Sequence, residues 1–184
     1  MTAAIQFPSP LTEHGLLCRL DDFGLIAAAG DDAKTFLHSQ LTNAVEDLQP
    51  GTARLAGYCS AKGRLLGTML IWADQANRVV MMARKELVAP LTKRLSMFVL
   101  RAKAKLHDAS GESVLFGIAG AGIDRLGPWW PKSPEVPMTA VTGPAGTLIR
   151  LPDAQGLPRW LWQAPAAVAQ EITATIGAGG DAEL

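Results

Sequence analysis

The side chains best suited to binding a ligand form a basic block in the middle of the chain. Residues 54–105 contain eleven Lys and Arg residues against Asp74 and Glu86, a net charge of +9. The flanking residues 1–53 and 106–184 carry −5 and −4, so the whole chain is neutral. Such a block predicts a site for an anionic ligand or a phosphate backbone. A solvated face that the acidic flanks neutralise after folding is an equally good interpretation.

Other side chains that commonly perform catalysis are isolated. The two cysteines stand alone and the three histidines have no neighbours at metal-ligand spacing, so the sequence predicts neither a disulfide nor a metal site. No Asp or Glu occurs from Leu48 to Ala73, which excludes paired carboxylates for acid–base work there. The glycine-rich stretch 117–127 is not a dinucleotide fingerprint, because Arg125 takes the place of its third glycine.

Two tryptophans form a second candidate binding surface. Trp160 and Trp162 alternate along an expected strand, so their indoles share one face of it. They form either a wall of the core or a stacking platform for a heteroaromatic ligand.

A β-hairpin and a helix carry most of the basic block. The apolar runs 55–60 and 65–73 flank Ala61-Lys62-Gly63-Arg64, where the glycine allows a positive φ, so the sequence predicts a hairpin with a basic tip. A third strand, a helix and two more strands follow, at residues 78–83, 86–101, 102–107 and 113–119. This order, β-β-β-α-β-β, predicts an α+β sheet with helices on one face.

The flanking regions supply further elements. Strands are expected at 16–20 and 25–29, and Asp31 or Asp32 is expected to cap the helix that follows them. A proline-rich loop at 127–137 precedes three strands, at 136–142, 147–151 and 159–163, and a final helix at 165–176. We therefore divide the chain into an amino-terminal part (1–52), a ferredoxin-like subdomain (53–126), and a part that completes the first subdomain (127–184).

Composition excludes two classes of protein. With 48% hydrophobic and 18% charged residues, the chain is too apolar to be disordered, and its apolar runs are too short to span a membrane. Residues 1–15 contain Glu13 and no Lys or Arg, so they lack the basic start of a signal peptide. These features predict a cytoplasmic protein that does not enter a membrane.

Three segments resemble a known family: residues 30–43 (GDDAKTFLHSQLTN), 48–51 (LQPG) and 58–66 (YCSAKGRLL). They are similar to the amino-terminal part of the YgfZ family of folate-binding proteins, relatives of the glycine-cleavage T-protein, an aminomethyltransferase. The resemblance implies ferredoxin-like α+β units around a cavity for tetrahydrofolate, and a carboxy-terminal β-barrel that this chain is expected to lack. It also implies a role in iron–sulfur enzyme maturation and in the tRNA modification that depends on it.

The sequence departs from the family in three places. The signature Lys-Gly-Cys-x-x-Gly-Gln-Glu is absent, and Leu184 ends the chain about where the segment leading to it would begin, as expected for a fragment or a shortened relative. The paired aspartates of the T-protein match Gly67 and Thr68, and the usual Thr-Asn-Asp is Thr42-Asn43-Ala44. The resemblance therefore implies a protein that binds folate without catalysing aminomethyl transfer.

Position within the resemblance suggests the folate contacts. We expect an apolar slot for the pterin ring and three cations for the carboxylates of the glutamate tail. The slot residues are Leu41, Tyr58, Met82 and Ala83, and the cations are Lys62, Arg64 and Arg84. Packing within the sheet is an equally good interpretation of Tyr58 and Met82.

Two other functions remain open. In the first, the basic block contacts tRNA phosphates in a nucleic-acid-binding module, and in the second, which the missing acids disfavour, the chain is an aminomethyltransferase. Iron–sulfur client proteins are the partners that the resemblance implies.

Overall fold

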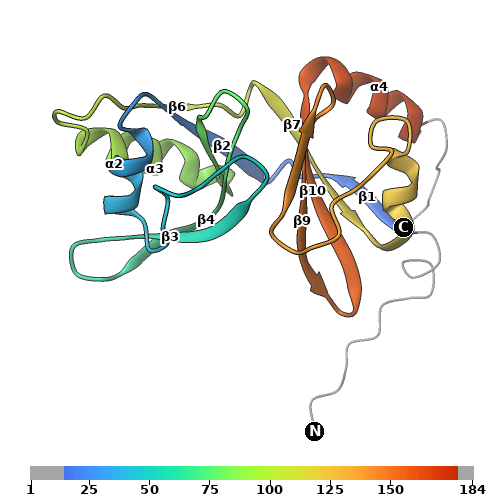
Figure 1. Cartoon of the computed structure of the whole chain (residues 1–184), viewed down its shortest axis with the longest axis horizontal. Coiled ribbons are helices and arrows are strands. Elements are labelled where there is room, and N and C mark those ends of the chain that lie inside the picture. The colour runs from blue at the N-terminus through green and yellow to red at the C-terminus, as the bar shows by residue number, and fades with distance from the viewer. Residues whose placement is uncertain (1–14, 178–184) are drawn as a thin grey trace, which may run out of the picture.

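Two antiparallel five-stranded sheets pack face to face in the computed structural model, which describes residues 15–177. Helices α2 and α3 cover the outer face of sheet B at one end of the molecule, and helix α4 and the 3₁₀ helix η1 cover sheet A at the other (Figure 1). The strand order is β3-β4-β5-β2-β6 in sheet B and β1-β7-β10-β9-β8 in sheet A. The predicted α+β class, with antiparallel sheet units and helices on one face of each, is confirmed.

Sheet B and its helices come from one continuous stretch of chain. Its elements are β2 (Phe23–Ala29), α2 (Ala33–Gln40), β3 (Ala53–Cys59), β4 (Leu65–Ala73), β5 (Val79–Arg84), α3 (Lys85–Met97) and β6 (Lys105–Asp108). The predicted hairpin is present as β3 and β4. Phe36 and Leu37 of α2 and Leu91 and Leu95 of α3 pack on the outer face of the sheet in one buried core.

Sheet A combines one early strand with the last part of the chain. Its elements are β1 (Leu16–Arg19), β7 (Ser113–Ala119), η1 (Gly120–Leu126), β8 (Ala140–Gly143), β9 (Gly146–Ala154), β10 (Leu157–Pro165) and α4 (Ala166–Gly177). Trp160 and Trp162 are buried beneath η1 and α4, and their indole N–H groups donate to the backbone oxygens of Pro134 and Ala145. The two indoles therefore form a wall of the core, and the stacking-platform interpretation is wrong.

A third core lies between the two sheets. Leu70, Trp72 and Val80 of sheet B meet Ile149 and Leu161 of sheet A, and all five are buried. Side chains alternate along a strand, so the odd and even positions of β4 and β5 serve different cores. The molecule thus has four layers: helices, sheet B, sheet A and helices.

Sheet membership does not follow the order of the strands in the sequence. The consecutive strands β1 and β2 lie in different sheets, because β1 pairs with β7 while β2 pairs with β5 and β6. Strand β7 was expected to belong to the ferredoxin-like subdomain (53–126), but it pairs with β1 and β10 in sheet A. Strand β2 occupies an interior position in sheet B, between β5 and β6. Its residues 24–28 are all buried, as expected for a strand that is covered on both faces.

The expected aspartate cap of α2 is wrong. Asp32 precedes the helix, but its carboxylate accepts a hydrogen bond from the backbone N–H of Lys103 at 2.7 Å and caps no amide of the first turn. Its own N–H donates to the Lys103 carbonyl at 3.2 Å. Asp32 therefore anchors the segment between α3 and β6 to the start of α2.

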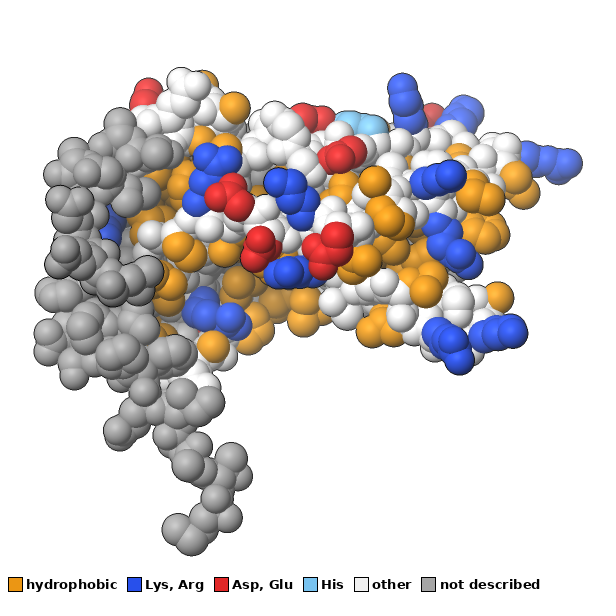
Figure 2. Space-filling view, turned by 180° about the vertical axis from the view of Figure 1, so that it is seen from behind, with side chains coloured by type: hydrophobic (Ala, Val, Ile, Leu, Met, Phe, Trp, Pro, Cys, Tyr) orange, Lys and Arg blue, Asp and Glu red, His pale blue; other side chains and the backbone are white. Residues whose placement is uncertain are grey.

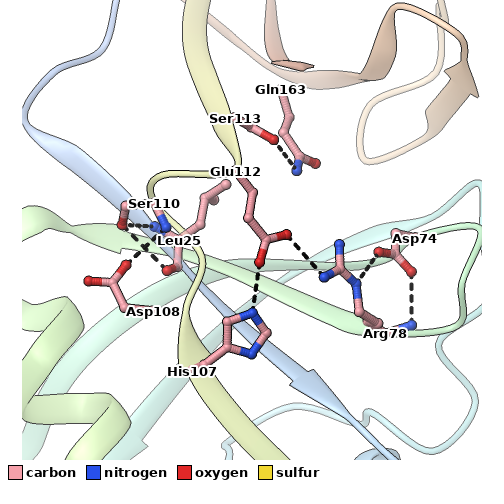
Figure 3. Close-up of polar contacts among 9 residues, drawn as sticks. All are labelled: Leu25, Asp74, Arg78, His107, Asp108, Ser110, Glu112, Ser113 and Gln163. Atoms are coloured by element: carbon pink, nitrogen blue, oxygen red, sulfur yellow. Dashed lines mark hydrogen bonds and ion pairs between the residues drawn. The ribbon is translucent and has the colours of Figure 1, made fainter. Parts of the chain in front are cut away.

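A chain of polar contacts fastens the link between β6 and β7 to the β4–β5 turn (Figure 3). Glu112 lies 2.8 Å from Nε2 of His107 and accepts from Nη1 of Arg78 at 3.0 Å. Arg78 also donates to Asp74 at 2.8 Å. The hydrogen bond to His107, and then the one to Arg78, lower the pKa of Glu112 below its ordinary value. Folding therefore favours the ionised form of Glu112.

Replacing Glu112 by Gln should lower the free energy of unfolding at neutral pH by up to about 1 kcal/mol, because the side chain is partly exposed and solvent screens its contacts. A carboxylate with a lowered pKa stabilises the fold above its unfolded pKa, and that contribution is lost as pH falls through the folded value. Urea unfolding at a series of pH values should show the difference between wild type and Glu112→Gln shrinking in acid. A constant difference would contradict this assignment.

Candidate functional site

Sheet A leaves part of the inner face of sheet B uncovered. Leu70 and Trp72 of β4 are buried between the sheets, whereas Thr68, on the same side of the strand, is exposed. Leu55 of β3 is 62% exposed, although it faces the same way. We call this uncovered area the open face and define it by Phe23, Leu55, Thr68, Met82 and Arg84.

Strand register sets the order of side chains on the open face. Leu55 pairs with Leu70, Leu70 with Met82, and Met82 with Leu25, so one apolar row crosses four strands. Neighbouring strands lie about 4.8 Å apart, which makes the row roughly 14 Å long. Thr68 lies in the next row, opposite Gly57 of β3. Leu70 and Leu25 are covered by sheet A, so the accessible part of this apolar strip is Leu55 and part of Met82, bordered by the Thr68 hydroxyl group.

Arg84 supplies a cation at the border of this strip. Its guanidinium carbon lies 5.4 Å from the centre of the Phe23 ring, and the two residues are paired across β5 and β2. Asp22 and Glu86 lie within 3.7 Å and 3.4 Å of the guanidinium. The ring and the two carboxylates hold Arg84 in place and partly neutralise it.

Lys62 and Arg64 lie at the tip of the β3–β4 hairpin. The tip is closed by a hydrogen bond from the Ser60 N–H to the Arg64 carbonyl at 2.8 Å, and Gly63 takes the positive φ of +75° that the turn requires. Both cations are exposed, and neither forms an ion pair with a described residue. Their charges are therefore available to an anion in solution.

The four residues expected to form the pterin slot do not lie together. Leu41 and Tyr58 are bridged to each other and buried with Ala83 in the core beneath α2 and α3. Met82 lies on the opposite side of β5, on the open face, because adjacent strand residues point to opposite faces. Of the expected apolar contacts, only Met82 is accessible from the open face.

The structure adds residues that the resemblance did not suggest. Phe23, Leu55 and Thr68 share the open face with Met82 and Arg84. Alternation along β5 already predicts that Met82 and Arg84 share a face that excludes Ala83. The exposure of Leu55 depends on how far sheet A extends over sheet B, which no local pattern reveals.

Gly67 and Thr68, the positions matched to the T-protein aspartates, face opposite sides of β4. Thr68 points to the open face, whereas a Cβ at Gly67 would lie 3.2 Å from Leu91 and 3.4 Å from Leu87 of α3. Helix α3 therefore closes over Gly67. Only position 68 can present a side chain to a ligand on the open face.

The Thr-Asn loop protects the edge of sheet B beside the open face. Thr42 exchanges two hydrogen bonds with Gly57, at 2.8 Å through its hydroxyl and 2.9 Å through its N–H. Asn43 donates to the Leu55 carbonyl at 2.9 Å. These bonds satisfy backbone groups of edge strand β3 and hold Leu55 in its exposed position.

The described residues 15–177 contain no candidate metal site, because no three His, Cys, Asp or Glu side chains lie close enough together to hold an ion. Burial raises the pKa of Cys18 above its ordinary value, which keeps the thiol protonated. No helix within the same residues is both long and apolar enough to cross a bilayer.

The arrangement of the sheets defines the class of protein. The structure matches the glycine cleavage system aminomethyltransferase T from Bartonella henselae with a TM-score of 0.77 at 16% identity, over 89% of this chain and 45% of that one. A heterotetrameric sarcosine oxidase from Corynebacterium sp. U-96 matches with a TM-score of 0.60 at 11% identity, over 92% of this chain and 87% of that chain. The chain thus has an aminomethyltransferase-like fold.

Sequence comparison narrows this class. The chain is 31% identical over 127 residues to the tRNA-modifying protein YgfZ of Edwardsiella ictaluri, which covers 68% of this chain and 37% of that protein. It is 28% identical over 172 residues to YgfZ of Photorhabdus laumondii, covering 91% of this chain and 50% of that protein. The chain is a relative of the YgfZ proteins, which confirms the resemblance read from its sequence.

The chain spans half or less of the length of these two YgfZ proteins. No protein-family model matches it. Any activity of the longer YgfZ proteins can therefore only be proposed for this chain.

Proposed function

We propose that this chain binds a reduced folate, tetrahydrofolate or a derivative, on the open face of sheet B, without catalysing a reaction. Its cellular role would be to support the maturation of iron–sulfur enzymes, and through them tRNA modification, in the cytoplasm. The observation that carries the proposal is the pair of accessible apolar side chains Leu55 and Met82, with the Arg84 cation beside them, on a chain related to tRNA-modifying YgfZ proteins.

The chemistry of folate fits the side chains present. A pterin ring linked to an aminobenzoyl group needs a flat apolar surface with a few polar contacts, which Leu55, Met82 and the Thr68 hydroxyl supply. The glutamate tail needs cations, and charge-assisted hydrogen bonds to carboxylates are the stronger ones. Arg84 borders the strip, and Lys62 and Arg64 are exposed on the hairpin that continues β3 and β4. No carboxylate faces the ligand from position 67 or 68 to stabilise a developing positive charge.

The double variant Lys62→Ala and Arg64→Ala should weaken binding of a polyglutamylated folate by about tenfold and that of the monoglutamate by much less. The longer tail carries additional carboxylates that the two cations at the hairpin tip can bind. Isothermal titration calorimetry measures both affinities. The matched control, Arg125→Ala with Lys132→Ala, removes two exposed cations outside sheet B and should leave both affinities unchanged. Equal weakening of the two ligands by the hairpin variant would refute its role in binding the tail.

A second candidate function is contact with tRNA phosphates, which an exposed basic surface without internal ion pairs favours. Seven exposed cations of the basic block form no ion pair with a described residue: Lys62, Arg64, Lys85, Lys93, Arg94, Arg101 and Lys105. Phosphate contacts weaken steeply as salt rises, whereas an apolar folate site does so much less. Repeating the titrations at several salt concentrations, with tRNA and with folate, separates the two functions.

A further inference from the structure

A groove separates helix α3 from the start of strand β4, on the side of sheet B opposite the open face. It has a volume of about 410 Å³ and is lined by Leu66, Leu87, Pro90, Leu91, Lys93, Arg94 and Met97. Gly67 lies beside its floor, where the absence of a side chain lets Leu87 and Leu91 approach β4. Five of the seven lining residues are apolar, and the two polar ones are cations. We call this feature the α3 groove.

Large apolar side chains continue from the groove onto the surface. Met97 is 68% exposed, Phe98 50% and Leu100 86%. The segment that carries Leu100 is ordered, because Asp32 forms two hydrogen bonds with the Lys103 backbone. Single exposed apolar residues are ordinary, but a run of them beside a groove is typical of an interaction surface.

Unpaired cations accompany this apolar surface. Lys93 and Arg94 line the groove, and Arg101 follows Leu100. None of the three forms an ion pair within the described part of the chain. Figure 2 shows blue Lys and Arg side chains with orange hydrophobic ones between them at the end of the molecule that holds sheet B. A binding partner must therefore satisfy an apolar centre and a cationic border.

We propose that the α3 groove docks an acidic amphipathic helix of a partner protein. Such a helix places apolar residues at i, i+3, i+4 and i+7 into an apolar groove and keeps its polar side outward. Carboxylates on that side would meet Lys93 and Arg94 at the border, and the attraction would set partner choice and association rate. An RNA strand fits this surface less well, because its phosphates gain nothing from Leu66, Leu87 and Leu91 at the centre. The proposal uses a surface separate from the open face and does not depend on folate binding.

The test is a titration of the full chain with fluorescein-labelled peptides of about 18 residues, or five helical turns, observed by fluorescence anisotropy. The peptides carry leucines at the stated spacing and Glu elsewhere. Saturable micromolar binding is expected, and a matched set with Lys in place of Glu should not bind. Met97→Asp, and separately Lys93→Glu with Arg94→Glu, should each weaken binding by about tenfold.

Two controls keep the result interpretable. Val136→Asp introduces the same charge at an apolar residue that is 64% exposed but outside the groove, and it should leave peptide binding unchanged. All the substituted side chains are exposed, so unfolding temperatures should match that of the wild type. The proposal is overturned if no acidic peptide binds, if Val136→Asp weakens binding as much as Met97→Asp, or if single-stranded RNA binds the groove while the peptides do not.

Discussion

Replacing Gly67 by Asp is expected to lower the free energy of unfolding by about 2–4 kcal/mol, since the new carboxylate would be buried without a partner. Position 67 is buried, and its Cβ would lie 3.2 Å from Leu91 and 3.4 Å from Leu87. Neither leucine can solvate a charge. Urea unfolding monitored by circular dichroism gives the free energy directly.

Two further variants distinguish the effect of the added charge on stability from the effect of the added volume. Gly67→Ala adds only the methyl group, which the ends of the two leucine side chains can accommodate by small shifts, so it should cost about 1 kcal/mol or less. Thr68→Asp places the same carboxylate one residue later, on the open face, and should change stability by less than about 0.5 kcal/mol. Equal costs for Gly67→Asp and Thr68→Asp would contradict the opposite orientations of the two positions.

Replacing Trp72 by Ala should lower the free energy of unfolding by about 3–5 kcal/mol, the usual cost of removing a large aromatic side chain from a core. Trp72 is completely buried between the sheets, among Leu70, Val80 and Ile149. Its indole N–H has no hydrogen-bond partner among the described residues, so Trp72→Phe loses no hydrogen bond and should cost clearly less.

Leu100→Ala is the control for this second prediction. Leu100 is 86% exposed, so its truncation should change stability by less than about 0.5 kcal/mol. Thermal and urea unfolding of the three variants would rank them. If Trp72→Ala proved as mild as Leu100→Ala, the two sheets would not pack through Trp72 as described.

Local patterns were enough to predict most elements of the fold. The β3–β4 hairpin follows from two apolar runs around Gly63, and helix α3 follows from apolar residues at helical spacing. Pairing between distant strands was not predictable in this way. Strand β1 looks like the first half of a hairpin with β2, but its partner β7 begins at Ser113. Which sheet a short strand joins depends on long-range packing that a local pattern does not contain.

The candidate site shows the same limit. Position within the family resemblance grouped Tyr58, Met82 and Ala83, although alternation places Met82 on the other face of the sheet from Ala83. Applying alternation to β5 would have separated them. Leu55 could not have been found from sequence, because its exposure arises where the cover provided by sheet A ends.

The way the chain passes between the sheets also sets an order of events during synthesis. All of sheet B lies between Phe23 and Asp108, and its first and last strands, β2 and β6, are neighbours. Sheet B can therefore close as soon as β6 has left the ribosome. Strand β1 is synthesised before the strands of sheet B but must wait for β7, and Trp72 stays uncovered until β9 and β10 have been made. The inner face of sheet B is thus a nascent-chain surface that a chaperone would meet before sheet A exists.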